Sequence, residues 1–213
     1  MLICRRNLNL NINQNINKVN FIELYNDLIN NRKIPLSLKL PIYQTNKYAN
    51  ENSYNKSLKN IKNRSLICLD GYTANNVEIA DLYDRTNNYL YHIKRGTKNI
   101  RVLSSQIANG ALLLHYYKHY HQYYDYNNIG NNIGNNTDKN NNSKKLLLDI
   151  HNYVTTHKID VINSKYKYVF GIIIPSSYNI SNISLNSQLS IGITCNILNS
   201  LNINYYIDFI PQS

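Results

Sequence analysis

Three short apolar segments separated by polar turns lie near the middle of the chain, and they restrict most strongly how it can fold. The segments 65–69, 77–83 and 89–94 each have the length of a strand, and Asp70 and Gly71 form a turn signal between the first two. Strand-like runs joined by short polar turns favour antiparallel pairing. We therefore predict a three-stranded meander in this part of the chain.

The remaining segments alternate between helical and strand-like patterns. Four helices are predicted, at residues 21–30, 99–117, 146–157 and 187–200. Two more strands are predicted at residues 166–174 and 205–210, each stopped by a proline. A strand, a helix and a strand in succession favour a parallel pair. We therefore predict an α/β fold in which helices flank a mixed sheet, in the order β-β-β-α-β-α-β.

The chain has 213 residues, which suits one domain with an appendage. Residues 1–20 are rich in Asn and are predicted to form a disordered arm. Residues 21–210 are predicted to form a single α/β domain. Within it, the low-complexity stretch 118–145 is predicted to be an insertion, and the polar stretch 44–63 a surface connection.

The chain is strongly basic. Its net charge is +11, from 23 basic residues against 12 acidic ones. A basic surface favours a polyanionic partner bound in a salt-sensitive way, and we expect nucleic acid, most simply DNA. Alternatively, the basic composition reflects only codon bias and ordinary solubility, because the abundant Asn, Ile, Lys and Tyr share AT-rich codons. The oligomeric state is left open.

Cysteine usage and hydropathy suggest an intracellular protein, either cytoplasmic or nuclear. Cys4, Cys68 and Cys195 are odd in number and form no CxxC pair. We expect buried free thiols in a reducing compartment. No apolar run has the length of a membrane span, and the first six residues are too short for the apolar region of a secretory signal.

A cluster of acids followed by a cluster of bases is the strongest local feature. The two clusters are Asp70, Glu78, Asp81 and Asp84, then His92, Lys94, Arg95, Lys98 and Arg101. Side chains alternate along a strand, so His92 and Lys94 share a face, and a neighbouring strand can place Asp81 beside them. Regular pleating puts Glu78 on the opposite face unless a bulge or a position at the strand's start brings it round.

Such a group suits metal-dependent hydrolysis of a phosphodiester. Carboxylates bind Mg²⁺, the metal activates water, and a Lys neutralises charge on the phosphate. Asp81, followed after ten residues by His92-x-Lys94, has the spacing of a PD-(D/E)xK nuclease motif. His92 stands where that motif has a carboxylate. Because His is a poor Mg²⁺ ligand, the alternatives are another metal such as Mn²⁺ or a general-base role for His92.

Each of these residues also has a structural interpretation. Asp84 suits a turn, Asp81 and Lys94 suit a cross-strand ion pair of little energetic value, and His92 suits a half-buried structural site. His115 and His119 have helical metal spacing. They lie in a biased, Tyr-rich run, however, which favours a solvated or disordered face.

Several segments resemble a family of sporadically distributed bacterial proteins of unknown function. Its pattern reads E-I-C-D-L, then L-I-H-V-K, then S-x-L-S-H-L-F-x-Q-G, and the matching segments here are 77–83, 90–95, 103–106 and 108–110. Residues 63–70 resemble its L-L-C-L-D strand, and 168–174 with 196–210 resemble its closing strand–helix–strand. The similarity extends over about 21–210. Members are usually longer at the N-terminus, so this chain looks like a C-terminal half.

The resemblance implies a set of characteristic positions: Glu78, Asp81, His92, Lys94 and Gln106. A Gln one helix after the Lys looks like restriction-endonuclease-like folds, which is an analogy. The first hypothesis is therefore a metal-dependent nuclease, or a degenerate relative that binds DNA. The second is a non-catalytic module that binds nucleic acid or protein and needs no metal.

The nuclease hypothesis gives each residue a role. Glu78 and Asp81 would bind the metal, Lys94 would position the attacking water, and His92 would act as ligand or base. Gln106 would orient the site from its helix. The phosphate contacts would come from three bases: Arg95, Lys98 and Arg101.

Overall fold

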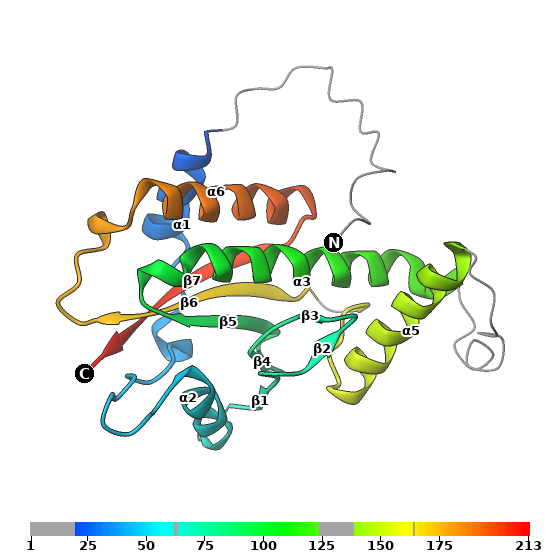
Figure 1. Cartoon of the computed structure of the whole chain (residues 1–213), viewed down its shortest axis with the longest axis horizontal. Coiled ribbons are helices and arrows are strands. Elements are labelled where there is room, and N and C mark those ends of the chain that lie inside the picture. Colours follow the sequence, from blue (N-terminus) through cyan, green and yellow to red (C-terminus); the bar gives the residue numbers. More distant parts are fainter. Residues whose placement is uncertain (1–19, 62–63, 124–138, 164) are drawn as a thin grey trace.

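The computed structural model describes residues 20–61, 64–123, 139–163 and 165–213 (Figure 1). Its main sheet has five strands in the order β1-β4-β5-β6-β7. Their bounds are Leu66–Cys68 (β1), Leu82–Asp84 (β4), Tyr89–Arg95 (β5), Lys167–Pro175 (β6) and Asn204–Gln212 (β7). The pairs β1–β4 and β4–β5 are antiparallel, and β5–β6 and β6–β7 are parallel. The predicted α/β architecture with a mixed sheet is confirmed.

The helices that cross between the parallel strands lie on one face of the sheet. Ile100–Tyr120 (α3) follows β5, and Leu185–Ser200 (α6) connects β6 to β7. Because β5, β6 and β7 follow one another across the sheet, crossovers of one hand place both helices on the same side. There α6 packs against both α3 and Phe21–Asn31 (α1) (Figure 1).

Alternating side chains of the strands fill two separate cores. Leu90 and Phe170 belong to the core beneath the helices, whereas Tyr91, Ile93 and Val169 belong to the core on the opposite face. Strand β5 therefore alternates as its sequence predicts, with its odd-numbered residues turned away from α3.

The opposite face is covered by the chain between α1 and β1. It contains Leu36–Leu38 (η2), Glu51–Ser57 (α2) and Leu58–Asn60 (η3). The prediction that 44–63 is a plain surface connection was therefore wrong. Asn50 and Ser53 form a capping box that starts α2, and the buried Tyr54 and Leu58 then pack it into the core on this face of the sheet. Two large buried side chains thus supply the packing that a count of apolar residues does not reveal.

The strand predicted at 77–83 is divided in the structure. Val77–Glu78 (β3) pairs with Thr73–Ala74 (β2) in a separate hairpin, and residues 79–81 then lead to β4. The hairpin turn consists of Asn75 and Asn76, whose φ angles are 49° and 62°. Two successive positive φ angles form the tight turn that suits a twisted hairpin, and Asn tolerates them. The division frees Glu78 from the pleat of β4.

The other predicted helices and strands agree with the structure apart from their ends. The helix predicted at 146–157 begins earlier, because Lys139–Thr156 forms α5. Of the predicted insertion 118–145, the described parts are the end of α3, His121–Tyr123 (η5) and the start of α5. Residues 124–138 lie outside the described residues, as do positions 1–19 of the predicted arm.

Two of the three cysteines are described, and both Cys68 and Cys195 are buried and free. Cys4 lies outside the described residues. Among the described helices, none combines the length and the apolar character that crossing a membrane requires.

Asp208 of β7 is a buried carboxyl that is only partly satisfied. Its Oδ2 accepts a hydrogen bond from the Leu40 amide at 3.0 Å, while its Oδ1 has no hydrogen-bond partner among the described residues. Burial raises the pKa of Asp208 from 3.8 to about 6. The folded state therefore holds the proton of Asp208 more tightly than the unfolded chain does.

Asp208→Asn should stabilise the protein at neutral pH. The raised pKa of Asp208 costs no stability below pH 3.8, and the cost grows until the pH passes about 6. It reaches about 3 kcal/mol, because one pKa unit corresponds to ~1.4 kcal/mol. Urea unfolding of both proteins across this pH range measures it. The free-energy difference between variant and wild type should increase toward neutral pH, and a difference that does not change with pH would contradict the assignment.

Candidate metal centre

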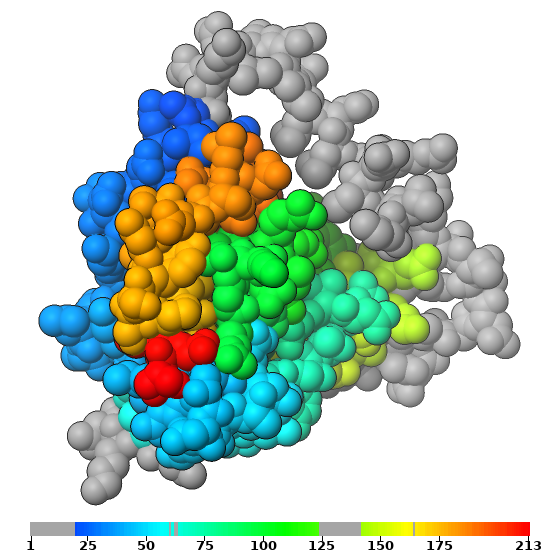
Figure 2. Space-filling model, turned by 60° about the vertical axis from the view of Figure 1, so that its left-hand side comes forward, coloured from blue at the N-terminus to red at the C-terminus, as the bar shows by residue number. Residues whose placement is uncertain are grey.

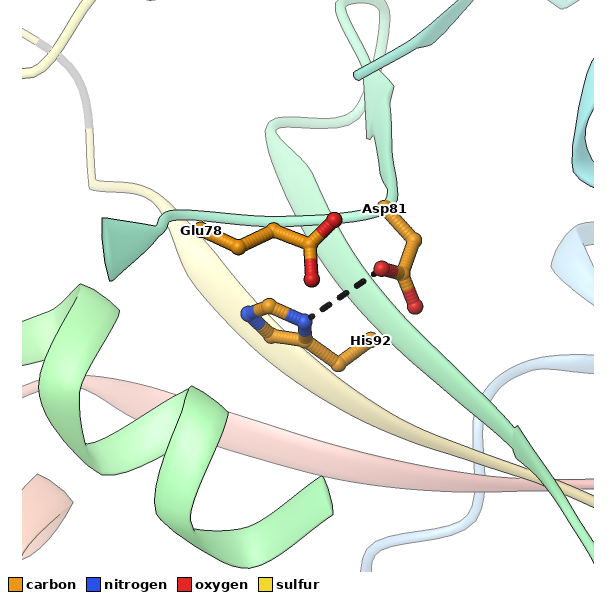
Figure 3. Close-up of side chains that lie close together, drawn as sticks. All are labelled: Glu78, Asp81 and His92. Carbon is orange, nitrogen blue, oxygen red and sulfur yellow. Dashed lines mark ion pairs between the residues drawn. The ribbon is translucent and has the colours of Figure 1, made fainter. Parts of the chain in front are cut away.

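Three side chains with metal-binding atoms converge where residues 79–81 pass over β5 (Figure 3). Glu78, Asp81 and His92 each offer one ligand atom, and these atoms all lie within 4.8 Å of one another. No second group of three His, Cys, Asp or Glu residues with this geometry occurs in the described part of the chain. We call these three residues the triad.

Asp81 is held where β4 separates from β5. Its backbone amide donates to the Tyr91 carbonyl at 2.8 Å, and its carbonyl accepts from the Leu69 amide at 2.8 Å. Its carboxylate Oδ2 accepts from the Ile93 amide at 2.5 Å. Ile93 lies beyond the last residue of β5 that pairs with β4, so the carboxylate takes the place of a backbone carbonyl. This bond directs Asp81 along β5 toward His92.

Glu78 reaches the same point from the β2–β3 hairpin. Its Oε1 accepts from the Gly71 amide at 3.1 Å, and its Oε2 accepts from Nε2 of Gln106 at 2.7 Å. The start of the hairpin and helix α3 therefore hold the carboxylate between them. Regular pleating would have placed Glu78 on the other face of the strand. Because the strand is interrupted at residues 79–81, Glu78 lies instead on the same side as Asp81 and His92.

His92 is fully buried, and one hydrogen bond defines its tautomer. Its Nε2 lies 3.0 Å from the Ile79 carbonyl oxygen, which only accepts, so Nε2 carries the proton. In the neutral ring Nδ1 then keeps its lone pair. Nδ1 is buried without a hydrogen-bond partner among the described residues, and it lies 3.7 Å from Oδ1 of Asp81. An unpartnered ring nitrogen that faces two carboxylates fits a bound cation.

The Ile79 carbonyl is itself fixed by two further residues. The Tyr168 hydroxyl donates to it at 3.2 Å, and the Tyr168 ring lies parallel to the His92 ring with centroids 6.3 Å apart. On α3, a Cβ at Gly110 would lie 2.8 Å from the Ile79 oxygen, so only glycine lets the helix approach this peptide. Gln106 lies one helical turn earlier and reaches Glu78 from the same face.

The two carboxyl groups of the triad have opposite pKa shifts. Burial and the neighbouring Asp81 charge raise the pKa of Glu78. Burial also opposes ionisation of Asp81, but the hydrogen bond and charge that a protonated His92 would supply, the charge of Lys94 and the Ile93 amide outweigh it and lower the pKa of Asp81. The charged form is therefore favoured at Asp81 and disfavoured at Glu78.

Lys94 lies beside the triad without pairing with Asp81. Its Nζ is 3.8 Å from Oε2 of Glu51, and its side chain is 19% exposed. Its charge nevertheless lowers the pKa of both triad carboxyls. Glu51 was missed by the sequence analysis because it lies in the stretch interpreted as a surface connection. Tyr168 was missed because the chain has 20 tyrosines and none stands out.

The predicted phosphate-binding residues separate in the structure. Arg95 donates from Nε to Gln212 at 3.1 Å and lies 5.3 Å from the Tyr43 ring centre. Lys98 and Arg101 instead line a cavity of about 760 Å³, together with Gln106. Only Lys98 and Arg101 thus share a cavity wall with a residue that contacts the triad.

The remaining acids and histidines of the sequence analysis have other surroundings. Asp84 forms a buried ion pair with Arg64 at 2.8 Å and accepts from the Thr86 amide, as a turn residue does. The rings of His115 and His119 lie 4.3 Å apart between centroids. No third ligand joins these two histidines within the described residues.

Comparison with known proteins identifies a family. The model of a family described as of unknown function (DUF6119) matches residues 15–211. No curated protein and no solved structure matches the chain. The matched region includes the triad, Gln106 and Gly110, and the expectation of an uncharacterised family is confirmed. The chain therefore belongs to this family of unknown function.

Proposed function

We propose that the protein is a metal-dependent phosphodiesterase that acts on nucleic acid, with DNA as the expected substrate. One observation carries the proposal: two carboxylates meet the unpartnered Nδ1 of buried His92, and the charge of Lys94 acts on both carboxyl groups. A carboxylate directly before β4 and a lysine on the neighbouring strand β5 of a mixed sheet also support a restriction-endonuclease-like fold, by analogy.

The residues of the site have complementary roles in hydrolysis. A divalent cation held by the triad would lower the pKa of a water molecule and offset charge on the phosphate. Lys94 donates to the attacking water or to a phosphate oxygen. Gln106 keeps Glu78 directed at the triad through its 2.7 Å hydrogen bond. The water molecule gives up a proton to solvent as its oxygen bonds to phosphorus, the bond from phosphorus to one sugar oxygen breaks, and that sugar oxygen takes a proton from solvent.

The donor set favours Mn²⁺ over Mg²⁺ as the working metal. Mg²⁺ prefers oxygen ligands, whereas an imidazole nitrogen suits later divalent metals better. His92 is fixed as a ligand by its Nε2 bond to Ile79 and is fully buried, which argues against a role as general base. Of the two metals considered from the sequence, Mn²⁺ is therefore proposed as the better activator.

Glu78→Gln should weaken Mn²⁺ binding at least about tenfold, because the amide keeps the shape of the side chain but removes the anionic ligand. Thermal unfolding with and without Mn²⁺ measures this. At ~100 times its Kd the metal should stabilise the wild type by about 2.7 kcal/mol. Glu23→Gln, an exposed site on α1, is the matched control and should respond to Mn²⁺ like the wild type. Equal stabilisation of all three proteins would show that Mn²⁺ does not bind at the triad.

Lys94→Ala should reduce Mn²⁺-dependent cleavage of plasmid DNA by about 100-fold or more, since removing one group that stabilises the transition state has this effect. Gel analysis of nicked and linear products measures the rate. Lys56→Ala removes an exposed lysine of α2 and should keep the full rate. If the wild type binds DNA in a salt-sensitive way but cuts no plasmid with Mn²⁺ or Mg²⁺, the protein is a non-catalytic binding module instead.

A further inference from the structure

The cavity beside Gln106 lies between the beginnings of two long helices. Its walls come from the turn before α3, from the first two turns of α3, and from the chain that enters α6. On the face shown in Figure 2, the start of α3 (green) lies next to the segment that leads into α6 (orange). The lining residues are Thr97, Lys98, Arg101, Val102, Ser105, Gln106, Asn182, Ser184, Asn186 and Ser187.

The charges in this cavity are of one sign. Lys98 and Arg101 are exposed, and no carboxylate is among the lining residues. Neither cation forms an ion pair with any described residue, whereas nearby Lys94 is paired with Glu51. The cavity therefore presents two uncompensated positive charges to whatever enters it, which favours an anion.

The helix ends and the hydroxyl groups add to this preference. Helix α6 has 16 residues and begins at the cavity wall, where Ser184 caps it by accepting from the Ser187 amide. The first turn of a helix carries the positive end of its dipole. Ser105 and Thr97 contribute hydroxyl groups, which can donate to phosphate oxygens.

Gln106 connects this cavity with the triad. Its Nε2 donates to Glu78 at 2.7 Å, while its Oε1 is buried with no hydrogen-bond partner among the described residues. One side chain therefore both lines the cavity and contacts a triad carboxylate. No triad residue lines the cavity itself, so Gln106 is the link between a group held there and a group bound at the triad.

We infer that this cavity holds a backbone phosphate of a polynucleotide, next to the phosphodiester that lies at the triad. The relation between the two phosphates rests on the proposed function. The inference restricts the substrate to chains with more than one phosphate, because a mononucleotide fills only one of the two positions. Lys98 and Arg101 are then the residues that recognise the flanking phosphate.

Lys98→Ala combined with Arg101→Ala should weaken binding of a fluorescein-labelled oligodeoxynucleotide about tenfold or more, measured by anisotropy in EDTA so that no cleavage intervenes. The slope of log K against log salt should become smaller by about 0.8, because one neutralised phosphate is lost. The charge-matched control is Lys56→Ala with Lys59→Ala, two exposed lysines on the opposite side of the sheet, and its affinity and slope should stay unchanged.

Two outcomes would overturn the inference. The first is a double variant with the affinity and salt slope of the wild type. The second is that the wild type binds adenosine monophosphate as tightly as the oligonucleotide and that the double variant loses affinity for both ligands equally. That result would identify a mononucleotide site. The proposed function can fail separately from this inference. If the wild type never cleaves DNA but the double variant still loses binding, the cavity is a phosphate site and the triad does not cleave DNA.

Discussion

The carbonyl group of Ile79 is the contact on which the candidate site depends. It accepts hydrogen bonds from His92 and from Tyr168, and the first of these leaves the other ring nitrogen of His92 with its lone pair toward the carboxylates. The carbonyl can face β5 only because the strand is interrupted at residues 79–81. It stays there because Gly110 lets α3 pack directly against the peptide. The break in the strand at residues 79–81, the tautomer of His92 and the packing of α3 therefore depend on one another.

The interruption breaks the backbone ladder, and side chains of the triad compensate for it. The Asp81 carboxylate satisfies the Ile93 amide, and Glu78 satisfies the Gly71 amide, so both acids stabilise the fold as well as forming the site. Burying two carboxylates together costs free energy unless they find compensating partners. The raised pKa of Glu78 and the unpartnered Nδ1 of His92 show that the compensation within the chain is incomplete.

A second buried charged group shows what complete compensation looks like. On the opposite face of the sheet, Asp84 accepts two hydrogen bonds from Arg64 and further bonds from the turn that follows it. Its carboxylate oxygens are fully used, which marks it as structural. Composition does not separate these two groups, because both combine buried acids with a basic neighbour. The unsatisfied nitrogen is what distinguishes the triad as a site for a ligand.

The sequence by itself determined the periodic elements and their order, because strand and helix patterns depend on local spacing. It also predicted that Asp81 lies beside the strand that carries His92 and Lys94, since short connections leave few alternatives. Only the tertiary structure decided the rest. The placement of Glu78 depends on a break inside an apolar run that reads as one strand. The partner of Lys94 is Glu51, 43 positions earlier in the chain. The cavity of Lys98 and Arg101 exists because two crossovers place α3 and α6 on one face. Contacts between residues this distant arise from packing, which no local pattern encodes.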